Sequence, residues 1–289
     1  MKGIISVLNT IQNRDKILGL ISWTASLATF LILGILLFDM ISDGFKAMSF
    51  EFFLNAPEKA GRAGGIAPIL ISTMLVVGIA IAVSMPIGLA TALLLSEFTR
   101  TDSQFAFFVR KSLDILAGVP SIVFGLFGNA FFCVYLGMGF SILSGGLTLA
   151  CMVLPILIRT TEESFRAVPN EFRHGIAALG FTKTASVFHL LMPMALPGLI
   201  VGTILGIGRA TAETAALIFT SGYVDRMPES VFDSGRTLSV HIYDLAMNIP
   251  GGDRMAYATS LCLVLILLCM SVLTNFIAKS VLQRGINIS

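Results

Sequence analysis

Long stretches without a charged residue constrain the fold of this chain more than any other feature. Residues 63–96 and 115–158 contain no Asp, Glu, Lys or Arg over 34 and 44 positions. A helix needs about 20 apolar residues to cross a bilayer. The first stretch therefore exceeds one span, and the second is long enough for two. Because a backbone in lipid must satisfy its own hydrogen bonds, we expect an all-α, polytopic membrane protein.

Three further stretches complete the predicted set of spans, at residues 17–38, about 195–220 and about 255–278. The apolar core of a signal peptide is about 7 to 15 residues long and ends at a small-residue cleavage site. Residues 17–38 are longer and lack such a site, so they predict an uncleaved anchor helix. The glycine cluster at 137–146 predicts the turn between the third and fourth spans.

The prediction is therefore six transmembrane helices in two parts. Residues 1–62 form the N-terminal anchor helix and the first external loop, and residues 63–283 form the main transmembrane domain. By the positive-inside rule, a cytoplasmic N-terminus places twelve Lys and Arg residues in cytoplasmic segments and six in external ones. We expect an inner-membrane protein with both termini cytoplasmic, a cytoplasmic segment at 159–193 and an external segment at 221–254.

Composition excludes several classes of function. Charged residues make up 12% of the chain, against about 25% in soluble domains. A net charge of +2 does not suggest a nucleic-acid partner. The four cysteines and three histidines form no cluster with metal-ligand spacing, so no metal, cofactor or catalytic centre is expected. The phosphate-binding loop of ATPases is absent, so any ATP hydrolysis is expected on a separate chain.

Two charged residues interrupt the fifth apolar stretch. Between Leu190 and Val224, only Arg209 and Glu213 carry a charge. A charge in a span costs about 2.5 to 3.5 kcal/mol and is tolerated against a bundle interior, a partner charge or a wet path. Residues four apart share one face of a helix, so we expect an ion pair. Either Arg209 binds a translocated anion with its guanidinium fork and Glu213 neutralises it, or the pair is structural.

Small residues and prolines predict how the spans pack. Residues Gly198, Gly202, Gly206, Ala210 and Thr214 recur every four positions, which allows two helix backbones to approach closely. Pro120 and Ser121 fall early in the predicted third span. A proline there bends the helix; alternatively, the freed carbonyls and the Ser121 hydroxyl line a path.

The cytoplasmic segment predicts a short amphipathic helix. Pro169 fits a first helical position and Gly180 fits just past a helix end. Apolar side chains at Phe172, Ile176 and Leu179 share one face. Such a helix can lie on the lipid surface or dock into a groove on a partner protein. Thr182 is expected to cap the following helix.

The same segment carries a recognisable motif. Residues 174–180 followed after nine residues by Leu190-Leu191-Met192-Pro193 resemble the EAA loop of ABC importer permeases, with His174, Gly175 and Ile176 in place of Glu-Ala-Ala. The resemblance implies a coupling helix that docks in a cleft of an ATPase subunit. Its predicted contact residues are Glu171, Phe172, Arg173, His174, Gly175, Ile176, Gly180 and Pro193. Glu171 or a protonated His174 would replace the contact of the missing glutamate.

Further segments resemble phosphate permeases of the PstA type. These segments are residues 118–125, residues 209–215, residues 64–68, and residues 241–243 followed by 256–259. Within residues 209–215, Ala212 stands where the family usually has glycine. The resemblance covers about residues 50 to 280 and implies a MetI-like ABC permease fold. It also implies an inorganic phosphate path at Pro120, Ser121, Arg209, Glu213 and Thr214.

The resemblance implies partners as well. They are a PstC-like permease in a heterodimer, two copies of a PstB-like ATPase and a periplasmic PstS-like phosphate-binding protein, which would contact the external segment. Two rival functions remain. One is a permease for another oxyanion such as sulfate or molybdate, and the distant one is an intramembrane enzyme.

Overall fold

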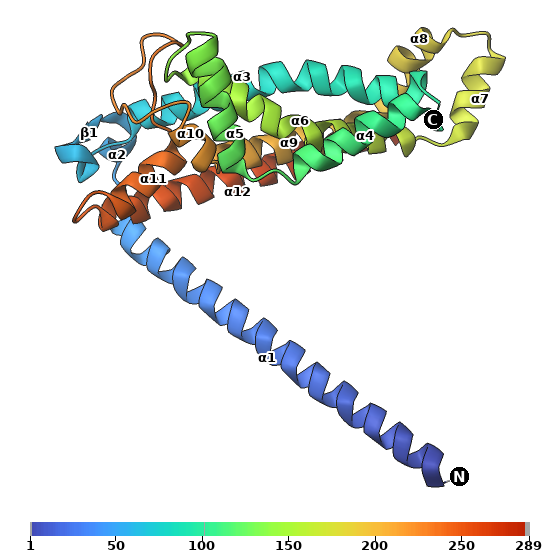
Figure 1. The fold of residues 1–289 in the computed structure, drawn as a ribbon, viewed down its shortest axis with the longest axis horizontal. Coiled ribbons are helices and arrows are strands. Elements are labelled where there is room, and N and C mark those ends of the chain that lie inside the picture. Colours follow the sequence, from blue (N-terminus) through green and yellow to red (C-terminus); the bar gives the residue numbers. More distant parts are fainter. Residues whose placement is uncertain (1, 101, 287–289) are drawn as a thin grey trace.

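The computed structural model describes residues 2–100 and 102–286 as a helical bundle with one outlying helix. Helix α1 (Lys2–Ala47) leaves the bundle and runs away from it (Figure 1). Apolar side chains cover it, and Trp23 and Phe30 are 77% and 75% exposed. It meets the bundle at Gly44, where an added Cβ would lie 2.8 Å from the carbonyl oxygen of Tyr257. The predicted anchor at 17–38 is thus part of a longer helix, whose apolar surface is free for lipid or another chain.

Three helices form the centre of the bundle. Helix α6 (Ile142–Arg166) packs between α3 (Ala67–Leu93) and α9 (Met192–Thr211). Their shared core contains Val76, Val153, Leu157 and neighbouring apolar residues. Helix α12 (Asp253–Ile286) packs against α1, α9 and α11 (Leu238–Met247). The central position of α6 makes it the element against which α3 and α9 are both fixed.

The predicted third span is broken. Helix α4 (Gln104–Ala117) ends at Gly118, and α5 (Ser121–Gly128) with the π-helical η3 (Asn129–Tyr135) continues at an angle of 100°. Pro120 is the N-cap of α5 and has extended backbone angles. It therefore does not bend a continuous helix as predicted but separates two helices, because residues before and at a proline disfavour helix continuation.

The turn before α6 is shorter than predicted. Gly137 and Gly139 form it with positive φ values of 68° and 62°. Gly145 and Gly146 do not belong to the turn, because the Ser141 hydroxyl caps α6 and the helix is already under way at both glycines. A Cβ on Gly146 would lie 2.6 Å from Ile79 Cγ2 of α3, so glycine there serves close packing.

Five of the described helices are long and apolar enough to cross a membrane, and the bent pair of α4 with α5 and η3 brings the number to six. Helices α1, α3 with η2 (Leu94–Phe98), α6, α9 with its preceding turns, and α12 are the continuous ones. The prediction of an all-α membrane protein with six spans is confirmed, with one of the spans broken.

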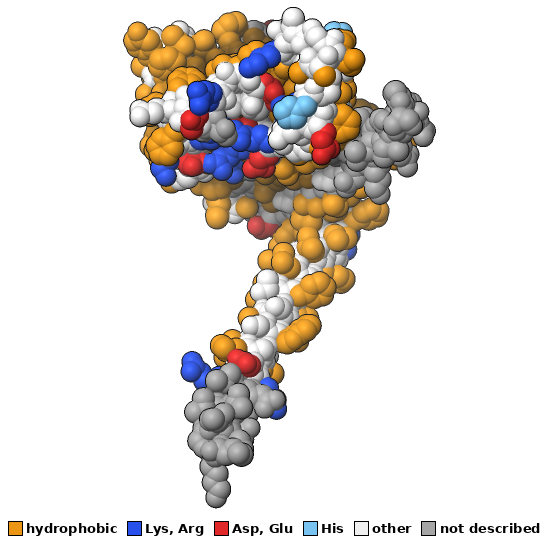
Figure 2. Space-filling view, turned by 90° about the vertical axis from the view of Figure 1, so that its right-hand side faces the viewer, with side chains coloured by type: hydrophobic (Ala, Val, Ile, Leu, Met, Phe, Trp, Pro, Cys, Tyr) orange, Lys and Arg blue, Asp and Glu red, His pale blue; other side chains and the backbone are white. Residues whose placement is uncertain are grey.

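The two ends of the bundle differ. One end carries α2 (Phe50–Leu54), a hairpin of β1 (Pro57–Glu58) and β2 (Ala63–Gly64), the 3₁₀ turn η1 (Lys59–Gly61) and α11. At the other end lie α7 (Asn170–Ala178), α8 (Lys183–Ser186) and the last residues of α12 (Figure 1). Seen from this second end, basic and acidic side chains gather on the bundle while α1 is covered with apolar ones (Figure 2).

Candidate translocation path and coupling surface

Arg209 lies beside the middle of α6. Three turns of α9 place Gly198, Gly202 and Gly206 against Ser164, Thr160 and Val153 of α6. Val153 is near the centre of that 25-residue helix, and Arg209 follows Gly206 by three residues. The predicted small-residue ridge is confirmed for the positions within α9, and it packs inside this chain. Thr214 falls outside the helix, where it is the N-cap of α10 (Ala215–Ile218).

The Arg209 side chain borders a cavity of about 340 Å³. Arg159, Thr160 and Glu163 of α6 line the same cavity, so two arginines and one glutamate border it. Arg209 itself is exposed on this chain. Because an exposed arginine at mid-bundle depth cannot remain against hydrocarbon, a second chain or water must cover it. The cavity is therefore open on this chain, where water or a second chain completes it.

The break in the third span opens onto this cavity. Leu116 and Ala117 at the end of α4 and Phe124 in α5 line it together with Arg209. Pro120 and Ser121 lie between these lining residues, and Ser121 is half-buried at the start of α5. The structure thus brings residues on either side of Pro120 and Ser121 to the cavity that Arg209 borders, although Pro120 and Ser121 are not among its lining residues.

The predicted ion pair between Arg209 and Glu213 does not form. Helix α9 ends at Thr211, so the two residues do not share a helix face. The Glu213 carboxylate instead accepts a hydrogen bond from the backbone N–H of Ala216, 3.2 Å away, at the start of α10. Its backbone carbonyl accepts from the Ser239 hydroxyl of α11 at 2.5 Å. These two bonds fix Glu213 in a turn, and the prediction of a neutralising partner for Arg209 is wrong for this residue.

A second set of charges lies at the end of α6. Glu162 is buried, and its Oε1 lies 2.9 Å from Arg110 Nη2 of α4 and 3.0 Å from Arg166 Nε. Arg159 pairs with Asp114 of α4. A buried carboxylate needs such partners because its desolvation is costly. These pairs fasten α4 to α6 and hold Arg159 at the edge of the cavity.

Helix α7 is the predicted amphipathic helix. It begins at Asn170, with Pro169 as its N-cap one position before the expected start. Gly180 follows its end with φ of 79°, which confirms the predicted helix stop. Phe172 and Leu179 of the predicted apolar face are 47% and 77% exposed, and Glu171 and His174 are exposed too. None of the residues of α7 is buried in this chain. Ile176 of the same face is half-buried and borders a pocket toward the bundle, so Phe172 and Leu179 are the part of the apolar face that lies exposed.

The segment after α7 returns to the bundle through a second capped turn. The Thr182 hydroxyl accepts from the N–H of Ala185 at 3.3 Å, as predicted. Helix α8 then passes through a π-helical segment, η4 (Val187–Leu191), into α9. Pro193 lies in the first turn of α9, where its missing N–H is tolerated. Gly175 lies within α7 with open space around it.

Arg173, predicted as a residue that contacts the ATPase, binds residues of its own chain in this structure. Its guanidinium turns inward and pairs with Glu97 of η2, and it donates to the carbonyl of Phe165 at 2.6 Å. Sequence reasoning missed Glu97, Arg159 and Glu163 as site residues. The available signal was position, since Glu97 and Arg159 are the first charges after the two longest uncharged stretches.

Residues 221–254, the segment predicted to be external, have their own structure, as the length of the segment predicted. Arg236 is its centre: its guanidinium lies 3.1 Å from Asp244 Oδ2 and donates to the Tyr223 carbonyl at 2.8 Å. Its Nη1 lies 3.3 Å from His241 Nδ1, and because arginine only donates, Nδ1 is the acceptor. Burial and the neighbouring Arg236 lower the pKa of His241 to about 4. Tyr223, Val224 and Phe232 remain exposed on the outer surface.

Comparison with known proteins decides the family. Residues 84–284 match the model of the binding-protein-dependent transport system inner membrane component. The chain belongs to this family. It is a permease subunit of an ABC importer, and thus an inner-membrane component with several apolar helices.

Relatives within the family are similar over most of this permease. The phosphate transport system permease protein PstA of Haemophilus influenzae is 30% identical over 241 residues, covering 83% of this chain and 85% of the relative. A PstA homolog of Mycoplasma pneumoniae is 35% identical over 250 residues, or 82% of this chain but 36% of the longer relative. The probable ABC transporter permease protein YqgI of Bacillus subtilis is 27% identical over 281 residues, covering 92% and 95%.

Solved structures support the fold of the permease. A chain of the bacterial alginate ABC transporter has a TM-score of 0.68 at 11% identity, covering 93% of this chain and 96% of that chain. A chain of the MetNI methionine ABC transporter has a TM-score of 0.59 at 17% identity, covering 75% and 94%. At these identities the likeness concerns the fold alone.

Proposed function

We propose that this permease imports inorganic phosphate and that the anion passes the Arg209 cavity. The observation that carries the proposal is the cavity itself, which joins a mid-bundle guanidinium to a break in a span. Similarity to chains named phosphate transport system permease protein PstA supports phosphate as the anion.

The chemistry of the cavity suits brief contact with an oxyanion. A guanidinium binds phosphate oxygens through two parallel N–H donors and keeps its charge at any physiological pH. Arg209 and Arg159 are the positive residues of this wall and Glu163 is the negative one, while Arg159 is paired with Asp114 of α4. Arg209 has no ion-pair partner among the described residues, so its charge is available to attract the anion, while the Glu163 carboxylate limits how tightly the anion is held. In this proposal Glu163 takes the counter-charge role that sequence analysis gave to Glu213.

A complete path requires a second permease. Arg209 is exposed on this chain, and one bundle does not enclose the cavity. A PstC-like partner in a heterodimer would supply the opposite wall. The external surface around Tyr223 and Phe232 would contact a periplasmic PstS-like binding protein. The bonds of Arg236 to Asp244 and to the Tyr223 carbonyl would keep this surface folded.

Energy would come from two PstB-like ATPase subunits on separate chains. Helix α7 would dock in an ATPase cleft with Phe172 and Leu179, whose exposure in this chain leaves them free for a partner. Closure of the ATPase pair on ATP would then move α7 and shift the bundle between outward-open and inward-open states.

This arrangement requires both termini and α7 to be cytoplasmic. Cysteines introduced at Thr184 of α8 and at Ser230 of the external segment test it, since both positions are exposed. The background variant has its four native cysteines replaced by alanine. An impermeant thiol reagent should label intact cells at position 230 and not at 184. The reverse pattern would overturn the orientation.

Uptake by the assembled importer tests the substrate. Purification of the tagged chain should recover an ATPase and a second permease, and the complex in vesicles with its binding protein should accumulate labelled phosphate on ATP. Excess unlabelled phosphate should compete, whereas sulfate and molybdate should not. Competition by sulfate or molybdate but not by phosphate would assign the permease to another oxyanion.

A further inference from the structure

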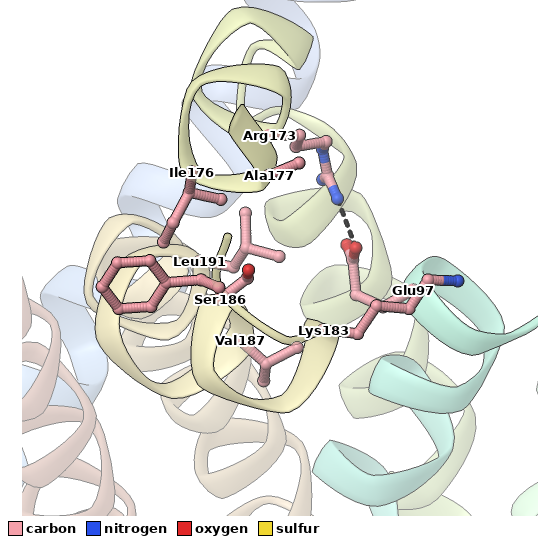
Figure 3. A pocket seen from close by; sticks show the side chains of 9 residues that line it. Glu97, Arg173, Ile176, Ala177, Lys183, Ser186, Val187 and Leu191 are labelled. Carbon is pink, nitrogen blue, oxygen red and sulfur yellow. Dashed lines mark hydrogen bonds and ion pairs between the residues drawn. The ribbon is translucent and has the colours of Figure 1, made fainter. Parts of the chain in front are cut away.

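Apolar packing by itself holds α7 only weakly to the bundle. None of its residues is buried, and its described packing partner is α8. A cavity of about 190 Å³ separates α7 from η4, lined by Ile176 and Ala177 on one side and Val187 and Leu191 on the other (Figure 3). A helix over such a gap transmits force poorly through apolar contact, because the side chains that line a void have no opposing atoms.

One side chain bridges the gap. Figure 3 shows Arg173 reaching from α7 to the Glu97 carboxylate. The Arg173 side chain is 23% exposed and that of Glu97 is 12% exposed, so the pair is largely shielded from water. A second guanidinium nitrogen of Arg173 donates to the carbonyl of Phe165, in the last turn of α6, at 2.6 Å. One residue of α7 therefore binds the ends of two spans, α3 through η2 and α6 directly.

We infer that Arg173 is the positioning residue through which movement of α7 reaches the spans, an inference that rests on the proposed coupling to an ATPase. The two spans it binds are themselves packed closely, since a Cβ on Gly88 of α3 would lie 2.5 Å from Leu157 Cδ2 of α6. Helix α6 in turn packs against the glycine face of α9, which carries Arg209. A displacement of Arg173 is thus passed to α3, α6 and α9 through direct contacts.

The energetics of the pair predict an unequal effect of its two members. Glu97 Oε2 is paired with Arg173, while Oε1 is buried without a hydrogen-bond partner. Removing the arginine leaves a largely shielded carboxylate without its ion-pair partner, which is strongly unfavourable. Removing the charge of Glu97 leaves Arg173 still bonded to the Phe165 carbonyl. Loss of the Arg173 charge should therefore reduce coupling between ATP hydrolysis and transport more than loss of the Glu97 charge does. Loss of both charges should reduce this coupling less than loss of the Arg173 charge alone.

The test compares Arg173→Gln, Glu97→Gln and the double variant in the complete importer with its ATPase and binding protein. Arg100→Gln is the matched control, because Arg100 is near the same end of α3 but pairs with the exposed Asp102. The measured quantity is labelled phosphate imported per ATP hydrolysed in vesicles, alongside the amount of assembled complex. We expect Arg173→Gln to lower this ratio by about 2- to 30-fold, the range for residues that carry coupling between sites.

In the same assay, Glu97→Gln should lower the ratio less, the double variant should recover toward Glu97→Gln, and Arg100→Gln should match the wild type. If Arg173→Gln does not assemble, Glu97→Gln and the double variant still test the inference. Both should assemble and import less phosphate per ATP hydrolysed than the wild type. The inference would be overturned if Glu97→Gln and the double variant both had the wild-type ratio. It would also be overturned if the reduction in the double variant equalled the product of the two single reductions. Absence of ATP-driven phosphate uptake in the wild type would instead overturn the proposed function, before any variant is compared.

Discussion

Gly206 of α9 lies against Val153 of α6 so closely that an added Cβ would come within 2.7 Å of the valine Cγ1. This contact fixes the height of Arg209 along the bundle, because the arginine follows Gly206 by less than one turn. It also means that α6 and α9 cannot slide independently. The position of the charge at the cavity thus depends on a set of glycines that themselves have no polar function.

The first prediction concerns that glycine face. Gly202→Ala should destabilise the permease, because the new Cβ would overlap the Thr160 side chain of α6. Overpacking of this kind typically costs about 1–3 kcal/mol. Gly208→Ala on the same helix is the matched control, since an added Cβ there meets no atom within 4 Å. Thermal unfolding in detergent should show a lower midpoint for Gly202→Ala alone. Equal midpoints in the two variants would contradict the packing.

The second prediction concerns the end of α7. Gly180 has φ of 79°, a conformation that costs a side-chain-bearing residue about 1–2 kcal/mol. Gly180→Val should therefore disturb the helix end and lower phosphate uptake relative to ATP hydrolysis. Gly137→Val, at a turn before α6 with φ of 68° and equally open surroundings, places the same strain away from α7 and should leave the ratio unchanged. If Gly180→Val couples as well as the wild type, the helix end has no part in energy transfer.

The third prediction is a pH dependence from the external segment. Burial and Arg236 lower the pKa of His241 to about 4, against an ordinary value of 6.5, while Asp244 opposes the shift. Between these values the unfolded chain binds a proton that the folded chain does not, so folding stability falls as pH decreases from about 6.5 toward 4. The full effect is on the order of 3 kcal/mol.

The measurement is the thermal midpoint at pH 7 and pH 5 for the wild type and for His241→Gln. Carboxylates titrate in both proteins, so the difference between their slopes isolates the histidine. The wild type should lose more stability on acidification than the variant does. Identical slopes would show that His241 is not held neutral by burial.

Local signals in the sequence predicted the local structure well. Gly180 and Thr182 were assigned to a helix end and a helix cap, and both roles depend on neighbouring residues within one turn. The ridge at Gly198, Gly202 and Gly206 follows from spacing alone, and so does the apolar face of α7. Six spans were predicted because lipid requires long uncharged helices, whatever their tertiary contacts.

Predictions that depended on distant contacts failed. The end of α9 before Glu213 is fixed partly by Ser239, 26 positions later in the chain, so i, i+4 spacing was misleading. Arg173 binds Glu97 across 76 positions, and no periodic pattern connects them. Helix α4 was missed as part of a span because Arg110, Lys111 and Asp114 interrupt it. The pairing of Arg110 and Asp114 with residues of α6 could not be seen from spacing.

Phosphate uptake by Arg209→Gln in the complete importer tests whether the anion passes this guanidinium. The glutamine keeps much of the side-chain length but removes the charge, so we expect normal assembly with phosphate uptake lowered by about 10- to 150-fold. That range corresponds to loss of about 1.5–3 kcal/mol from a hydrogen bond to a charged group. Arg254→Gln, which removes an exposed charge at the start of α12, should transport normally. Wild-type uptake by an assembled Arg209→Gln importer would contradict the claim that the anion passes this guanidinium.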